Sequence, residues 1–145
     1  MYIIHPLTLD LLLKYRESYF STLDSLVESP VLDEHMTTII FKRMVQQETQ
    51  IFVAVHETAW IIWCITIFLE QKLIRGGALA AHLEEVVVRK GYESQGIGSA
   101  LLKTALAHAF DHGCYKIVLE CSDQLVPFYE KSGFKKSEVG MKLYL

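Results

Sequence analysis

The stretch of chain that most restricts the fold is a buried strand that turns directly into a helix. Val86, Val87 and Val88 are contiguous and β-branched, which is typical of a strand covered on both faces. After a charged turn, Gly96 and Gly98 open a segment with a wide apolar stripe at helical spacing. Glycine costs about 1 kcal/mol relative to alanine inside a helix. The two glycines therefore indicate a helix start where bare backbone N–H groups closely approach a ligand, the usual way of holding phosphate.

Apolar spacing and cap residues predict three longer helices. Thr8 or Asp10 would cap the first, and Asp33 would open the second. Gly113 lies at the C-terminal turn of the third, where glycine commonly ends a helix. The predicted helices span 7–26, 34–47 and 96–113.

Runs rich in β-branched and aromatic residues predict the strands. Two of them form a pair with a turn near Glu57 and Thr58, and the sequence RGG at 75–77 ends the second strand or forms a hairpin loop. The predicted strands span 1–5, 50–56, 59–74, 78–88 and 114–122.

The last part of the chain predicts a short helix and a final strand or two. Pro127 lacks an N–H and therefore belongs in the first turn of a helix over 125–133, with its cap near Asp123 or Gln124. Residues 134–145 would supply the final strands. The complete order predicts a mixed α/β fold, a central mixed β-sheet with helices on both faces, formed by one domain over residues 1–145.

Composition excludes several classes of protein. Apolar residues make up 51% of the chain and charged residues 21%, which argues against disorder. A net charge of −3 without lysine or arginine runs predicts no nucleic-acid partner. The longest apolar run, 59–69, is too short to span a bilayer, and the N-terminus lacks the basic region of a signal peptide. Three cysteines without paired spacing fit a reducing compartment, so the expected location is the cytoplasm.

Two segments together resemble a known family. The sequence VVVRKGYESQGIGSALL, followed by FYEKSGF, resembles the Gcn5-related N-acetyltransferases (GNAT). That superfamily carries Arg/Gln-x-x-Gly-x-Gly/Ala at a strand-to-helix turn and an aromatic-Tyr-x-x-x-Gly-Phe helix later. From Lys72 to Met141 the segments KLIR, HLEEVVV, GCYKIVLECS and FYEKSGF are similar, in order and spacing, to its glucosamine-6-phosphate N-acetyltransferases.

The resemblance implies acetyl-coenzyme A as cosubstrate and no metal. Backbone N–H groups of the glycine-rich turn would hold its pyrophosphate, and the edge of the valine strand would pair with the pantetheine amides. The chain departs from the family at Glu93, where Arg or Gln is usual, and at Leu125, where many members carry Asn. Gln95, Arg89 or Lys90 would then face the phosphates. The implied cofactor-binding residues are Val86, Val87, Val88, Glu93, Ser94, Gln95, Gly96, Ile97, Gly98 and Ser99.

The same resemblance implies three catalytic residues: Tyr129, Glu120 and Glu84. Tyr129 matches the tyrosine that donates to the departing thiolate, although such a residue also commonly packs a helix on a sheet. Glu120 matches an acid that meets the substrate, and a solvated residue at a strand end is nearly as good a description. Neighbours on a regular strand face opposite ways, so only one of Glu84 and Glu85 would face the amine, directly or through water. The N–H of Val86 or Val87 would meet the oxyanion.

The implied acceptor is glucosamine 6-phosphate, bound by Lys72, Arg75, Glu84, Glu85, Glu120 and Lys142. Lys142 would replace an Arg that the family carries where this chain has Tyr144, whereas Lys72 and Arg75 could equally be a solvated hairpin tip. His108 and His112 at helical spacing lack an obvious third metal ligand.

The subfamily implies a homodimer that exchanges its C-terminal strand. Two alternatives remain open: another small amine or a peptide as acceptor, or a non-catalytic module that binds coenzyme A.

Overall fold

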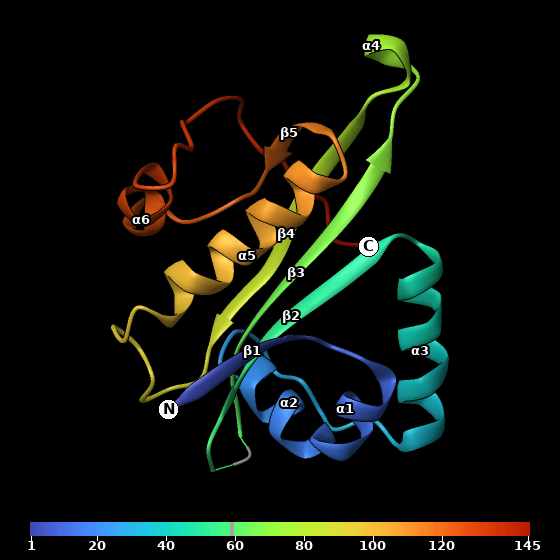
Figure 1. The fold of residues 1–145 in the computed structure, drawn as a ribbon, viewed down its shortest axis with the longest axis vertical. Coiled ribbons are helices and arrows are strands. Elements are labelled where there is room, and N and C mark those ends of the chain that lie inside the picture. Colours follow the sequence, from blue (N-terminus) through green and yellow to red (C-terminus); the bar gives the residue numbers. More distant parts are fainter. Residues whose placement is uncertain (59) are drawn as a thin grey trace.

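The computed structural model describes residues 1–58 and 60–145, which build one five-stranded sheet (Figure 1). The strands lie in chain order, with antiparallel pairs throughout except for the last, parallel pair. Such a mixed sheet confirms the predicted fold class. The strands are β1 (Tyr2–Pro6), β2 (Thr49–His56), β3 (Ile61–Gln71), β4 (Leu79–Val88) and β5 (Cys114–Val118).

Helices cover both faces of the sheet, as predicted, and each face has its own apolar core. One face packs against α1 (Leu9–Lys14), α2 (Arg16–Leu23) and α3 (Glu34–Gln46). The other packs against α5 (Ile97–Asp111) and α6 (Val126–Glu130), which a short 3₁₀ turn at Asp123–Leu125 precedes. The short turn α4 (Ile74–Gly77) forms the tip of the projecting β3–β4 hairpin (Figure 1). No helix among the described residues combines the length and apolar character that crossing a membrane requires.

The helix signals in the sequence are confirmed at three places. The Thr8 hydroxyl accepts from the N–H of Leu11 at 3.2 Å, and the Asp33 carboxylate accepts from the N–H of Met36 at 2.8 Å. Gly113 follows α5 with a φ of 73°, a left-handed conformation that suits glycine.

Four predictions about elements are wrong. The first helix is two helices that meet at Tyr15, whose φ of −112° and ψ of 27° are not helical. β3 begins at Ile61, while Ala59, where the strand was expected to start, lies outside the described residues. A 3₁₀ turn, rather than a side-chain cap, leads into α6. Among residues 119–145 no strand forms, because this segment finds no neighbouring strand within its own chain.

The separation of β4 from β5 is the feature that matters for function. Their pairing runs from Leu79 opposite Cys114 to His82 opposite Val118 and then stops. β4 continues to Val88, paired only with β3. A register shift opposite Ile65 and a φ of 48° at Glu85 mark a bulge in this part of β4. We call the point where β4 and β5 part the β4–β5 split.

Candidate active site

The edge of β4 beyond the β4–β5 split offers backbone groups for a ligand. Beyond His82, the side of β4 that faces β5 has no strand partner among the described residues. Peptide groups on such an edge can pair with the amides of an extended ligand. Val86 packs toward the α5 core, Val87 packs toward the α1–α3 core, and Val88 is half-buried. The structure therefore holds the predicted valine strand rigidly while leaving its edge available.

The glycine-rich turn leads from this edge to the N-terminus of α5. Gly96 is the N-cap of α5 with a φ of 75°, and no atom lies within 4 Å of the position that a Cβ would take. Ser94 also has a left-handed φ, 60°. No side chain caps the helix, so its first N–H groups remain available to an anion. Glu93 accepts from the N–H of Gly91 at 2.8 Å, which engages its carboxylate within the turn.

Gly98 has a packing reason that the sequence did not reveal. A Cβ at Gly98 would lie 2.6 Å from the indole ring of Trp63 on β3. Trp63 is fixed in turn by the donation of its Nε1–H to the carbonyl of Tyr92 at 3.2 Å. The missing side chain at Gly98 therefore lets α5 approach β3, a close helix–strand contact. Of the two glycines, only Gly96 faces open space.

Glu84 and Glu85 lie on one face of the sheet, so the prediction that they face opposite ways is wrong. Glu84 is opposite Thr66 in the register, and the Thr66 hydroxyl donates to the Glu85 carboxylate at 3.1 Å. The bulge at Glu85 breaks the regular alternation on which the prediction rested. Both carboxylates therefore lie on the α1–α3 side of the sheet, next to the β4–β5 split.

Two more predicted residues lie beside Glu84. The Lys142 ammonium is 3.2 Å from the carboxylate of Glu120, which follows the end of β5. Glu120, then Tyr144 and Glu84, raise the pKa of Lys142. The structure thus gathers Glu84, Glu120 and Lys142 into an exposed cluster of opposite charges at the β4–β5 split.

Tyr129 lies on α6 in the α5 core, in edge-to-face contact with the rings of Phe128 and Phe134. Burial, with a smaller effect of nearby Cys121, raises the pKa of Tyr129. Its hydroxyl is therefore protonated at neutral pH and can donate a proton. Cys121 itself is exposed, whereas Cys114 is half-buried and packs against the α5 core.

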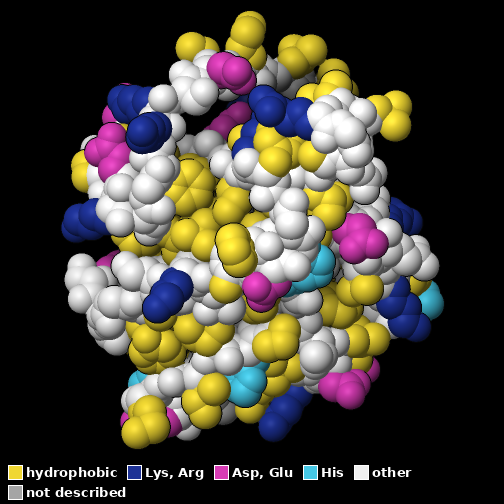
Figure 2. Space-filling view, turned by 45° about the horizontal axis from the view of Figure 1, so that its top comes forward, with side chains coloured by type: hydrophobic (Ala, Val, Ile, Leu, Met, Phe, Trp, Pro, Cys, Tyr) yellow, Lys and Arg dark blue, Asp and Glu magenta, His cyan; other side chains and the backbone are white. Residues whose placement is uncertain are grey.

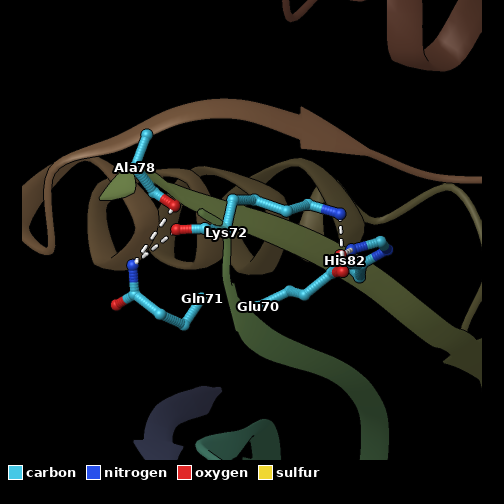
Figure 3. A network of polar contacts seen from close by, with 5 residues as sticks. All are labelled: Glu70, Gln71, Lys72, Ala78 and His82. Carbon is cyan, nitrogen blue, oxygen red and sulfur yellow. Dashed lines mark hydrogen bonds and ion pairs between the residues drawn. The ribbon is translucent and has the colours of Figure 1, made fainter. Parts of the chain in front are cut away.

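The two cations predicted to bind phosphate are both engaged. The Lys72 ammonium lies 2.5 Å from the Glu70 carboxylate (Figure 3), and the Arg75 guanidinium stacks 4.9 Å from the centre of the Tyr115 ring. The Gln71 amide fixes the base of this hairpin by donating to the carbonyl of Gly77 at 2.7 Å. Among the described residues, neither cation forms an ion pair with Glu84 or Glu120.

The contacts between His82 and Glu70 were not predicted from the sequence. The His82 Nε2 lies 2.7 Å from the second oxygen of Glu70 (Figure 3), and its ring stacks on Phe68 at 4.4 Å. Hydrogen bonds from Lys72 and His82 lower the pKa of Glu70. His82 and Glu84, two apart on one strand, could have been placed on one face from their spacing alone.

Known proteins share both the sequence and the fold of this chain. The model of the acetyltransferase (GNAT) family matches residues 11–134. Glucosamine 6-phosphate N-acetyltransferases are similar: that of Trypanosoma brucei is 34% identical over 131 residues, 88% of each chain, and that of Schizosaccharomyces pombe is 39% identical over 88 residues, 61% of this chain and 79% of the relative. The crystal structure of a Trypanosoma brucei acetyltransferase, 30% identical, superposes with a TM-score of 0.94 over 100% of both chains. The matched residues include both the strand-to-helix turn before α5 and the tyrosine-bearing helix α6, and this chain belongs to the acetyltransferase (GNAT) family.

Proposed function

We propose that this protein transfers the acetyl group of acetyl-coenzyme A to the amino group of glucosamine 6-phosphate. The observation that carries the proposal is the free edge of β4 at the β4–β5 split, with Glu84 and Glu120 beside it. The names of the relatives support the choice of acceptor. The three cysteines carry free thiols, which supports the cytoplasm as its location.

The residues present fit the cosubstrate, which would supply an activated thioester carbonyl. The edge of β4 from Val86 to Val88 would bind the pantetheine amides, and the turn from Glu93 to Ser99 would bind the pyrophosphate. The chain offers this pyrophosphate backbone N–H groups and a helix dipole, while the Glu93 carboxylate accepts from the N–H of Gly91 within the turn.

The side chains around the split suit attack by an amine. Glu84 and Glu120 would attract the ammonium group of the acceptor and orient it toward the edge of β4. A backbone N–H of Val86 or Val87 would stabilise the negative charge that develops on the carbonyl oxygen. Tyr129, kept protonated by burial, would donate a proton to the departing thiolate.

Release of free thiol from acetyl-coenzyme A in the presence of glucosamine 6-phosphate tests the proposal. Tyr129→Phe should lower kcat by about 10²-fold with KM values within about threefold, since general acid catalysis typically contributes that much. Tyr2→Phe on β1 makes the same change outside the site and should leave kcat unchanged. Wild-type protein that releases no thiol with this sugar would rule out the assignment.

One observation favours a second acceptor class. Lys72 and Arg75, the cations expected to bind the sugar phosphate, are held by Glu70 and Tyr115. An amine without a phosphate would not need them. Comparing kcat/KM for glucosamine 6-phosphate, glucosamine and a set of small amines and peptides separates the two classes. A preference for glucosamine over its phosphate would support the second.

We also propose that the active form is a homodimer. Val139, Met141, Leu143 and Leu145 alternate along the C-terminal segment and are all at least 85% exposed. Figure 2 shows hydrophobic side chains spread widely over one face of the molecule. An alternating apolar segment beside an unpaired sheet edge favours strand pairing with a second copy. Lys142, which contacts Glu120 within one chain, lies in the same segment, so pairing of this segment with a second copy would help to fix the site.

A further inference from the structure

We propose that His82, held by Glu70, accepts the proton that the acceptor amine loses before it attacks the thioester. This inference rests on the proposed acetyl transfer and assigns the proton acceptor of that site. A primary amine arrives largely as an ammonium ion, whose nitrogen has no lone pair to form a bond. Some group at the β4–β5 split must therefore take a proton from it.

The place of His82 in the fold suits this role. It is the last residue of β4 that pairs with β5, so its side chain lies where the two strands part. The neighbouring pair in the register, Thr66 opposite Glu84, continues the same face. With strands rising about 3.3 Å per residue, Glu84 lies roughly 7 Å further along β4. The imidazole side chain remains 25% exposed, so water and a small substrate can reach it.

The contacts of His82 fix both the position and the tautomer of the ring. The ring lies flat on Phe68, with 4.4 Å between centroids and 2° between planes. Its Nε2 is 2.7 Å from Glu70, whose other oxygen binds Lys72 (Figure 3). Because these bonds lower the pKa of Glu70, its carboxylate is ionised at neutral pH and can only accept. The Nε2 must then carry the hydrogen, which leaves the lone pair on Nδ1.

No hydrogen-bond partner of Nδ1 is found within residues 1–58 and 60–145. The ionisable groups on the elements next to His82 are Glu70 on β3 and Lys72 just after it, Glu84 on β4, Lys116 on β5, and Glu120 with Lys142 beyond β5. An imidazole ordinarily titrates near pH 6.5 and a carboxylate near 4.3, so the imidazole is the stronger proton acceptor.

The step balances without any other reactant. The N–H bond of the ammonium breaks, and its proton moves to Nδ1 of His82, directly or through one water molecule. The electron pair stays on the amine nitrogen, which then forms the bond to the carbonyl carbon. The ionised Glu70 carboxylate, which already binds the ring, offsets the positive charge that forms on the imidazole.

The pH dependence of kcat, at saturating concentrations of both substrates, tests this role. We expect the pH profile of wild-type kcat to have an acid limb, along which kcat falls because a protonated His82 cannot accept the proton of the amine. His82→Gln keeps a donor toward Glu70 but cannot accept the proton, and should lower kcat about 10²-fold and remove that limb. Glu70→Gln should give a smaller loss. His5→Gln, on the edge strand β1, is the matched control and should match wild type.

Nitrogen NMR of the imidazole gives a second readout that needs no turnover. We expect His82 as the Nε2–H tautomer in the wild type and a mixture of tautomers in Glu70→Gln. A wild-type Nδ1–H tautomer, or a His82→Gln variant that keeps both the acid limb and kcat, would overturn the role of His82 alone. Wild-type protein without acetyl transfer would instead overturn the proposed function and, with it, this inference.

Discussion

Three residues with a left-handed backbone lie around the proposed site. Glu85, Ser94 and Gly96 have φ values of 48°, 60° and 75°. Only the glycine adopts this conformation without steric cost. Gly96 was therefore identifiable from the sequence as a turn residue, whereas Glu85 and Ser94 were not, because neither residue type signals it. The bulge at Glu85, which brings two carboxylates to one face, was missed for this reason.

The strain at Ser94 leads to a stability prediction. Ser94→Gly should raise the free energy of unfolding by roughly 0.5–1 kcal/mol, since relief of the left-handed strain exceeds the added flexibility of the unfolded chain. Ser99→Gly, in the first turn of α5, is the control and should lower it by about 0.5–1 kcal/mol. Urea titration measures both. Shifts of the same sign in the two variants would contradict this account of Ser94.

At the scale of elements, the contact of α5 with β3 depends on the absence of a side chain at Gly98. A methyl group there would meet the Trp63 ring at 2.6 Å. Gly98→Ala should lower the free energy of unfolding by about 1–3 kcal/mol, the usual cost of overpacking a core. Adding Trp63→Leu should remove most of that penalty, because the smaller side chain leaves room for the methyl group.

Gly96→Ala is the matched control for this pair of substitutions. It should also lower the free energy of unfolding, but only because alanine is strained at a φ of 75°, since open space surrounds this position. Adding Trp63→Leu should not reduce the loss of stability caused by Gly96→Ala. Equal coupling of Trp63 to both glycines, measured by urea unfolding of the single and double variants, would refute the packing role of Gly98.

The ion pair between β3 and β4 predicts a pH effect on stability. The folded-state pKa of Glu70 is lowered, so its stabilising effect is present above the ordinary carboxyl pKa and is lost as pH falls through the folded value. Below about pH 4.5, the Tm of Glu70→Gln should therefore fall less with decreasing pH than the Tm of wild type. Glu28→Gln, at an exposed position, should follow wild type through the same acid titration. Parallel Tm curves for wild type and Glu70→Gln would contradict the assignment.

Sequence patterns at this scale predicted which segments are helices and strands better than how they pair. The sequence predicted β4 and the start of β5 correctly, yet nothing in it marks His82 and Val118 as the end of their pairing. Beyond that point Leu83 and Val86 on β4, and Leu119 after β5, still pack against the α5 core, so the apolar pattern continues past the split. The break at Tyr15 was hidden in the same way, because apolar spacing continues through it.

At the scale of the whole molecule, the C-terminal segment has the sequence pattern of a strand but forms none within a single copy. The final strands predicted over 134–145 would include Val139, Met141, Leu143 and Leu145, but these side chains are exposed and unpaired with any strand in a single copy. The pattern in the sequence is that of a strand, whereas the partner it needs is absent from the chain itself. This explains why a local prediction failed for the single copy.

A second copy would supply that partner, so the assembly state should depend on the apolar alternation. Replacing Met141 and Leu143 with Asp should convert a wild-type particle of twice 16.6 kDa into one of 16.6 kDa, as measured by light scattering during gel filtration. Acetyl transfer should fall with it, because the segment that carries Lys142 would no longer be fixed by pairing with a second copy. Lys135→Asp reverses a charge ahead of the alternating residues and should leave both mass and turnover unchanged. A wild-type mass of one chain, or a double variant that stays at twice that mass, would show that this segment does not join two copies.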